Sequence, residues 1–219
     1  MILAAGKGTR LLPLTETVAK PMILINSEPL VVHQIRWLKR AGIRDIVINL
    51  HHLGDQIQSC LGSGRHLGVK VTFSREEDLL DTGGGIAQAL QYLGDAPFLV
   101  LNGDIWTNFP FTTLTEKSTQ TAHLILQPAE SDSAPRDFRL DGKLVKKDED
   151  KSKHTHTFCG ISLLHPRVFD NQSQRTFSLT RDLLFALTKD DKVSGESFTG
   201  TWIDIGTPKG LKRVRRVTM

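Results

Sequence analysis

The sequence predicts an α/β fold in which a mixed, mostly parallel sheet is flanked by helices. Short apolar runs alternate with amphipathic segments in the first half of the chain, and this alternation is typical of parallel strands joined by crossover helices. The 219 residues, 39% of them hydrophobic, suffice for one well-buried domain and are few for two. We therefore expect a single domain over residues 1–219.

Four apolar runs in the first half are expected to be strands. The run at residues 45–50 is rich in β-branched residues, and the run at residues 98–101 is wholly apolar, which suits a central strand buried on both faces. The expected strands are residues 1–5, 45–50, 69–73 and 98–101.

Helices are expected between these strands. Leu30, Ile35 and Leu38 recur at helical spacing, and Gly42 follows them as a suitable C-cap. The expected helices are residues 29–41, 54–61 and 84–93.

The second half is less regular. We expect strands at residues 122–127 and 158–164 and a helix at residues 180–188. Residues 131–153 are polar and highly charged, which favours a β-hairpin with an exposed, mobile tip.

The composition is that of a basic protein. The net charge is +4 and the pI is about 9.1, which suits a polyanionic ligand or weak binding to nucleic acid. Aromatic residues do not alternate with the basic ones, so we expect no nucleic-acid partner.

The cysteines and the apolar stretches bear on location. Cys60 and Cys159 are the only cysteines and do not form a CxxC pair. No apolar stretch approaches the roughly 18 residues that span a membrane, and no signal-peptide pattern precedes the first strand. We expect a reduced, cytoplasmic protein without a membrane partner, either a monomer or a small homo-oligomer. The first expected strand begins at Met1, so a few further residues upstream in the native chain are not excluded.

The stretch Leu3-Ala4-Ala5-Gly6-Lys7-Gly8-Thr9-Arg10 follows directly on the first expected strand. Its two glycines let the main chain turn tightly and point several N–H groups the same way, which makes a nest for an anion. Lys7, Arg10 and Lys20 add positive charge, and arginine binds phosphate oxygens in bidentate fashion. The pattern indicates a polyphosphate-binding loop.

Two better-known phosphate loops do not fit this stretch. A Walker A motif needs a glycine where the chain has Met1, and Pro13 would interrupt the helix that must follow the lysine. In the dinucleotide fingerprint, a glycine belongs where Leu11 stands.

Acidic and glycine-rich segments indicate where the rest of a ligand lies. Asp104 closely follows the strand at residues 98–101, and open α/β sheets bind ligands at the carboxyl ends of strands. A carboxylate that faces a triphosphate suits Mg²⁺, which takes one or two carboxylates besides water and phosphate oxygens. Thr82-Gly83-Gly84-Gly85 heads an expected helix, where three glycines would be unfavourable without a ligand close to the backbone.

Together with Pro13 and Lys20-Pro21, the phosphate loop resembles the signature of the sugar-1-phosphate nucleotidyltransferases. That resemblance implies a Rossmann-like nucleotidyltransferase fold, and transfer of a nucleotidyl group to a sugar 1-phosphate with release of pyrophosphate. Further motifs of the family follow in order: Asp81-Thr82-Gly83-Gly84-Gly85-Ile86, Leu101-Asn102-Gly103-Asp104-Ile105-Trp106-Thr107, Phe158-Cys159-Gly160-Ile161-Ser162, Val193-Ser194-Gly195-Glu196 and Gly200-Thr201-Trp202-Ile203-Asp204-Ile205-Gly206-Thr207.

The resemblance also implies roles for individual residues. Lys20 acts on the α-phosphate and Arg10 on the leaving β- and γ-phosphates, and both are catalytic. The implied Mg²⁺ ligands are Asp104 and Asp204. The residues implied to bind the nucleotide are Ala5, Gly6, Lys7, Gly8, Thr9, Arg10, Lys20, Thr82, Gly83, Gly84 and Asn102. Those implied for the sugar phosphate are Asn102, Trp106, Asp137, Gly160 and Glu196.

The expected reaction needs no general base. A phosphate monoester has a second pKa of about 6, so a sugar 1-phosphate is already mostly a dianionic nucleophile at neutral pH. We therefore expect no covalent intermediate, and catalysis by alignment and by neutralisation of charge on the departing pyrophosphate.

Within the family, the sequence is most similar to the bacterial uridylyltransferases that join UTP and N-acetylmuramate 1-phosphate in cell-wall recycling. Asp81 departs from the glutamate expected at its position. Two alternatives stay open: thymidylyl or guanylyl transfer to glucose or mannose 1-phosphate, and an inactive ligand-sensing subunit of the same fold. Intact Arg10, Lys20, Asp104 and Asp204 speak against the second.

Overall fold

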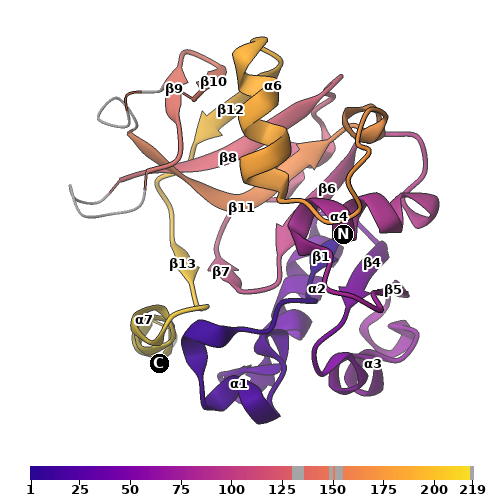
Figure 1. Ribbon diagram of the computed structural model, residues 1–219. Coiled ribbons are helices and arrows are strands. Elements are labelled where there is room, and N and C mark those ends of the chain that lie inside the picture. Colours follow the sequence, from indigo (N-terminus) through magenta and orange to yellow (C-terminus); the bar gives the residue numbers. More distant parts are fainter. Residues whose placement is uncertain (130–135, 148–149, 151–154, 218–219) are drawn as a thin grey trace.

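The centre of the computed structural model, which describes residues 1–129, 136–147, 150 and 155–217, is a nine-stranded sheet (Figure 1). In spatial order its strands are β5 (Lys70–Arg75), β4 (Asp45–Leu50), β1 (Ile2–Leu3), β6 (Phe98–Asn102), β11 (His156–Leu164), β8 (Ala122–Pro128), β12 (Val193–Ser197), β10 (Leu144–Lys146) and β9 (Arg139–Asp141).

Most of these strands run in one direction. β5, β4, β1 and β6 pair in parallel, and β12 is parallel to β8. β11 is antiparallel to both of its neighbours, and β9 and β10 form an antiparallel hairpin at the edge. The predicted mixed, mostly parallel sheet is confirmed.

Helices cover both faces of the sheet. α2 (Leu30–Arg40) and α3 (Gly54–Leu61) pack apolar side chains such as Ile35 and Ile57 against one face. α4 (Asp81–Ala89) packs Ile86 against the other face, together with the π-helical turn Leu179–Leu184 and α6 (Phe185–Lys189). Figure 1 shows α6 lying across the sheet.

Smaller elements extend the structure beyond the main sheet. β7 (Ile105–Thr107) and β13 (Trp202–Asp204) form an antiparallel ribbon, and β2 (Leu24–Ile25) and β3 (Glu28–Pro29) form a hairpin. The remaining helices are α1 (Leu14–Thr17), α5 (Thr112–Thr115) and α7 (Pro208–Val217). In the part of the chain that the structure describes, no helix has the length and apolar character needed to cross a membrane.

Several boundaries differ from the sequence prediction. The first strand is only Ile2–Leu3, because the chain beyond it turns into the phosphate loop. The expected helix at residues 180–188 begins as a π-helical turn, capped where Ser178 Oγ accepts from the Arg181 N–H. The expected hairpin exists as β9 and β10, but it turns at Gly142, and Val145 is fully buried. Residues 131–135, 148–149 and 151–153 of the predicted segment lie outside the described residues.

The glycines of α4 have a different explanation from the one expected. The helix begins at Asp81, three residues before its predicted start, and contains all three glycines. A Cβ on Gly83 would lie 2.3 Å from the ring of Phe177, on Gly84 2.3 Å from the Arg175 carbonyl oxygen, and on Gly85 2.5 Å from Glu76 Oε1. Protein atoms therefore account for all three glycines without a ligand, and nucleotide binding by Gly83 and Gly84 stays a prediction.

This packing predicts that Gly83→Ala destabilises the protein. In most helices the change stabilises by up to about 1 kcal/mol, but here the added methyl meets Phe177 and should cost about 1–3 kcal/mol. Urea unfolding followed by circular dichroism gives the sign. A variant at least as stable as the wild type would contradict the close packing of α4.

Candidate active site

A cavity of about 130 Å³ lies at the carboxyl ends of β1 and β6. Four segments that are distant in the sequence form its wall: Leu3, Ala5, Gly6 and Lys20; Asn49; Leu79, Asp81 and Thr82; and Asn102, Gly103 and Asp104. Six of these residues are among those that the sequence implied for the nucleotide and the metal. The parallel pairing of β1 with β6 brings the phosphate loop and the turn of Asp104 to one edge of the sheet.

The phosphate loop leaves β1 at this cavity. Gly8 has a φ of +67°, and a Cβ there would lie 2.8 Å from Thr15 Cγ2, so the turn requires glycine. Thr15 Oγ1 donates to the Gly8 carbonyl at 2.9 Å. The N–H groups of Gly6, Lys7 and Gly8 donate to no acceptor among the described residues, so they are available to an anion.

Lys20 and Asp104 form an ion pair at the cavity. Lys20 Nζ lies 2.7 Å from Asp104 Oδ2, and both side chains are largely buried. Lys20 opens a short 3₁₀ helix, and Asp104 lies in the tight turn between β6 and β7. Burial of two charges is unfavourable unless they are paired, and such pairs gather at functional sites.

A second carboxylate and the loop arginine lie beside this pair. Arg10 Nη2 is 3.4 Å from Asp204 Oδ2. A Cβ on Gly206 would lie within 2.9 Å of Asp204 Oδ1, Asp104 Oδ2 and Arg10 Nη2 at once. The three groups therefore converge on one point next to the Gly206 backbone.

The electrostatics of this point suit a cation. Burial raises the pKa of the Asp204 carboxyl and the negative charge of Asp104 raises it further, while the Gly206 N–H, Arg10 and Lys20 lower it. A divalent ion between the carboxylates would relieve their repulsion. No third histidine, cysteine, aspartate or glutamate joins them within the described ranges, so water and phosphate oxygens would complete the shell.

Comparison with known proteins identifies the family. The sequence model of the nucleotidyl transferase family matches residues 1–218. The chain belongs to the nucleotidyl transferase family. It is an enzyme of the sugar-1-phosphate nucleotidyltransferase class.

Relatives of this nucleotidyltransferase differ in substrate. The N-acetylmuramate alpha-1-phosphate uridylyltransferase of Neisseria meningitidis is 37% identical over 98% of this chain and 96% of its own. A mannose-1-phosphate guanyltransferase of Aspergillus oryzae is 30% identical over 95% of this chain, which spans only 61% of that relative.

Solved structures confirm the nucleotidyltransferase fold. HddC from Yersinia pseudotuberculosis superimposes with a TM-score of 0.85 at 24% identity, covering 100% of this chain and 98% of its own. A UDP-glucose pyrophosphorylase crystallised with UDP-glucose gives a TM-score of 0.78 at 20% identity, covering 99% and 96%.

The start of α4 forms another wall of the site. Asp81 has a φ of +59°, which is rare for a residue other than glycine, and its Oδ1 accepts the Thr82 N–H at 2.6 Å. Asp81 Oδ2 pairs with Arg181 Nη2 at 3.0 Å. Thr82 lines the cavity, and its Oγ1 accepts the Leu179 N–H. The aspartate found in place of the expected glutamate is thus engaged with protein groups.

Two residues expected to bind the sugar phosphate lie together. Gly160 has a φ of +67°, and a Cβ there would lie 2.6 Å from Asn102 Nδ2. Gly160 lies where the register of β11 with β8 shifts, so the strand bulges next to Asn102. Asp137 is near the same strand, because its Oδ2 accepts the Phe158 N–H at 3.0 Å.

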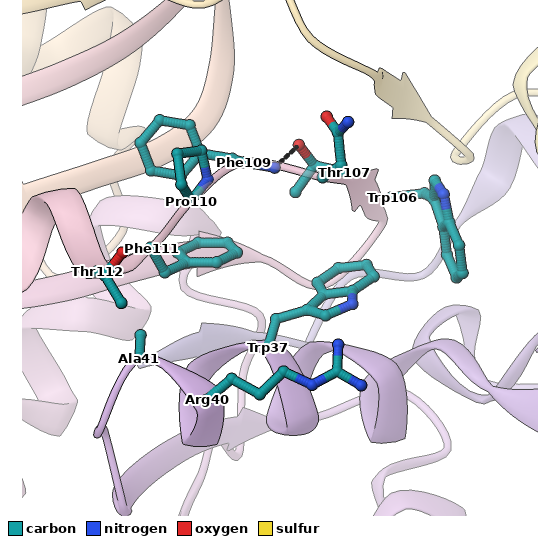
Figure 2. A pocket seen from close by; sticks show the side chains of 10 residues that line it. Trp37, Arg40, Ala41, Trp106, Thr107, Phe109, Pro110, Phe111 and Thr112 are labelled. Atoms are coloured by element: carbon teal, nitrogen blue, oxygen red, sulfur yellow. Dashed lines mark hydrogen bonds between the residues drawn. The ribbon is translucent and has the colours of Figure 1, made fainter.

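Trp106 lies on the other side of the β7–β13 ribbon. Asp204 pairs with Ile105, and Ile203 pairs with Trp106, so Trp106 and Asp204 point to opposite faces. The Trp106 ring instead packs on Trp37 of α2 at 5.2 Å, beside a cavity of about 410 Å³ (Figure 2). The structure does not bring Trp106 to the carboxylates.

Glu196 is held by other side chains. Its Oε2 lies 3.1 Å from Lys117 Nζ and 3.7 Å from His123 Nε2. Burial lowers the pKa of His123, although the Glu196 charge opposes that shift. Glu196 does not line the cavity of the phosphate loop.

Three residues at the site were missed by the sequence reasoning. Asn49 accepts the Ala4 N–H and donates to Glu76 Oε1, and Glu76 Oε2 accepts the Leu80 N–H, so the pair joins two walls of the cavity. Trp202 Nε1 donates to the Cys159 carbonyl, which places an indole beside Gly160. Asn49 could have been found as a polar residue near the end of an apolar strand.

The paired carboxylates predict that Asp104→Asn and Asp204→Asn each weaken divalent-ion binding. Changes to outer-shell groups already cost about 10–100-fold in metal affinity, so the loss of a ligand should cost at least about tenfold. Mn²⁺ binding measured by electron paramagnetic resonance tests this, with circular dichroism to confirm folding. Asp55→Asn, on the surface, is the control. Unchanged Mn²⁺ affinity in either variant would remove that residue from the metal site.

Proposed function

We propose that this nucleotidyltransferase transfers UMP from UTP to N-acetylmuramate 1-phosphate, giving UDP-N-acetylmuramate and pyrophosphate. The substrate assignment rests on the 37% identity to an N-acetylmuramate alpha-1-phosphate uridylyltransferase over nearly the full length of both chains. The proposal includes a cytoplasmic location, where UTP is available, and a role in the recycling of cell-wall sugars.

The site geometry supports the reaction type. Lys20 lies between Gly6 and Asp104 and would bind the α-phosphate, while Arg10 beside Asp204 would bind the phosphates that leave. Asp104 and Asp204 would hold Mg²⁺, which would supply further neutralisation of phosphate charge. The free N–H groups of residues 6–8 would hold the triphosphate, so that the attacking sugar phosphate meets an aligned α-phosphorus.

The sugar would lie toward Asn102 and Gly160. The structure supports Asn102, Gly160 and Asp137 as neighbours through β11, and Trp202 offers an indole beside them. Trp106 and Glu196 would need rearrangement to reach the same ligand, so they are the weaker members of the expected set.

The main alternative is guanylyl transfer to mannose 1-phosphate. Relatives with that name match 95% of this chain at about 30% identity, but the chain spans only 61% of them. A panel of nucleoside triphosphates against sugar 1-phosphates, scored by pyrophosphate release, decides between the two. If no pair of nucleotide and sugar 1-phosphate is turned over, the result would favour the inactive ligand-sensing subunit.

The phosphate contacts predict large kinetic effects. Arg10→Ala and Lys20→Ala should each lower kcat/KM by about 100-fold or more, because each stabilises charge that develops as pyrophosphate leaves. Steady-state kinetics with UTP tests this, and Arg44→Ala on the surface is the control. A rise in KM alone, with kcat unchanged, would mean uniform binding instead of transition-state stabilisation.

The lactyl group predicts the sugar preference. N-acetylmuramate is N-acetylglucosamine with an added lactyl group that ends in a carboxylate. Arg136 and Arg139 lie next to Asp137 in the sequence, and a guanidinium from this segment could bind that carboxylate. N-acetylmuramate 1-phosphate should exceed N-acetylglucosamine 1-phosphate by at least about tenfold in kcat/KM with UTP, about 1.4 kcal/mol of transition-state binding. Equal kcat/KM values for the two sugar phosphates would contradict the substrate assignment but not the reaction class.

A further inference from the structure

Two glutamines outside the motifs hold the backbone of the Lys20–Asp104 pair. Gln34 belongs to α2 and Gln56 to α3, the two helices that cover one face of the sheet. Neither was implied for the site by the sequence, and neither lines its cavity. Each uses its side-chain amide on main-chain groups next to one member of the pair.

Gln56 holds the segment that leads to Lys20. Its Oε1 accepts the Ala19 N–H at 2.9 Å, and its Nε2 donates to the Thr17 carbonyl at 2.8 Å. Both polar atoms of the Gln56 side chain therefore form hydrogen bonds with the residues on either side of Val18. Among the described residues no strand pairs with this segment, which connects the four-residue helix α1, ending at Thr17, to the 3₁₀ turn that Lys20 opens. These two hydrogen bonds from α3 fix the position of the backbone that leads into Lys20.

Gln34 holds the turn that carries Asp104. Its Nε2 donates to the Asn102 carbonyl at 2.9 Å and to the Ile105 carbonyl at 3.0 Å, on either side of the Gly103-Asp104 turn. Because both partners are carbonyl oxygens, the amide nitrogen must face them. Its Oε1 is buried without a partner among the described residues. A fully buried amide with an unsatisfied oxygen is unfavourable for stability, which favours a positional role over a packing role.

We infer that Gln56 and Gln34 are positioning residues for the proposed reaction, Gln56 acting through Lys20 and Gln34 through Asp104. The inference rests on the proposed roles of those two residues. The pair spans 84 residues of sequence and two loops, so its geometry depends on what holds each loop. Catalysis by alignment is sensitive to such support, because a displacement of about 1 Å can cost about 100-fold in rate.

The test for Gln56 is a double-mutant cycle with Lys20. Gln56→Met keeps the length of the side chain and removes both hydrogen bonds, and we expect a loss of about 10–100-fold in kcat/KM in the wild-type background. In the Lys20→Ala background the same change should cost less than about twofold, because the group it positions is gone. Gln58→Ala, on the exposed side of the same helix, should leave activity unchanged.

The test for Gln34 uses metal binding and needs no turnover. With Mn²⁺ as the probe, Gln34→Met should weaken binding by about tenfold, whereas Gln56→Met should change it less than about twofold. Thermal unfolding of every variant separates loss of fold from loss of position. Gln34→Leu, which also has no group that can donate to the two carbonyls, should weaken Mn²⁺ binding as Gln34→Met does.

The outcomes distinguish this inference from the proposed function. Full activity in Gln56→Met, or equal losses with and without Lys20, would overturn the role of Gln56, and unchanged Mn²⁺ affinity in Gln34→Met would overturn that of Gln34. If Lys20→Ala alone is fully active, or the wild type binds no Mn²⁺, the proposed roles of Lys20 or Asp104 fail first. The corresponding positioning role is then overturned with them.

Discussion

The ammonium of Lys20 and the carboxylate of Asp104 lie 2.7 Å apart in a largely buried place, and the rest of the site is arranged around them. Burial of an ion without a partner costs several kcal/mol, and the contact between the two side chains offsets part of that cost. Asp204 and Arg10 add a second ion pair at the same point, so each of the two carboxylates has a cation beside it. The two carboxylates and the two cations balance one another, so in the proposed reaction a triphosphate and a divalent ion would enter together without leaving a single charge buried and unpaired.

The parallel half of the sheet makes this convergence possible. β1 and β6 are adjacent and end at the same edge, so the phosphate loop and the Asp104 turn emerge side by side. The helices beneath supply more than apolar cover, since α2 and α3 each send one glutamine to the loop backbone. Asn49 and Glu76 extend the same principle to the third wall, where buried amide and carboxylate groups join the end of β1 to the start of α4. Rigid elements thus hold loops that have little regular structure of their own.

The β7–β13 ribbon separates two environments. One face carries Asp204 and Trp202 toward the sheet, and the opposite face carries Trp106 into an aromatic cluster with Trp37 and His33. Strand alternation makes this division unavoidable, because residues one apart on a strand cannot share a face. The face of the ribbon that carries Asp204 therefore contains Trp202 and not Trp106.

Local periodicity predicts the alternation of strands and helices, which the structure confirms, and short motifs predict the phosphate loop and the two acidic residues that it brings to one point. Contacts between distant segments decide the order of strands in the sheet, the register of β7 with β13 and the hydrogen bonds from Gln34 and Gln56. The same holds for the glycines of α4, whose neighbours Phe177 and Arg175 lie about 90 residues away along the chain. A pattern along the chain shows which residues are polar or small, but the protein atoms that fill the space around them come from segments brought together by folding.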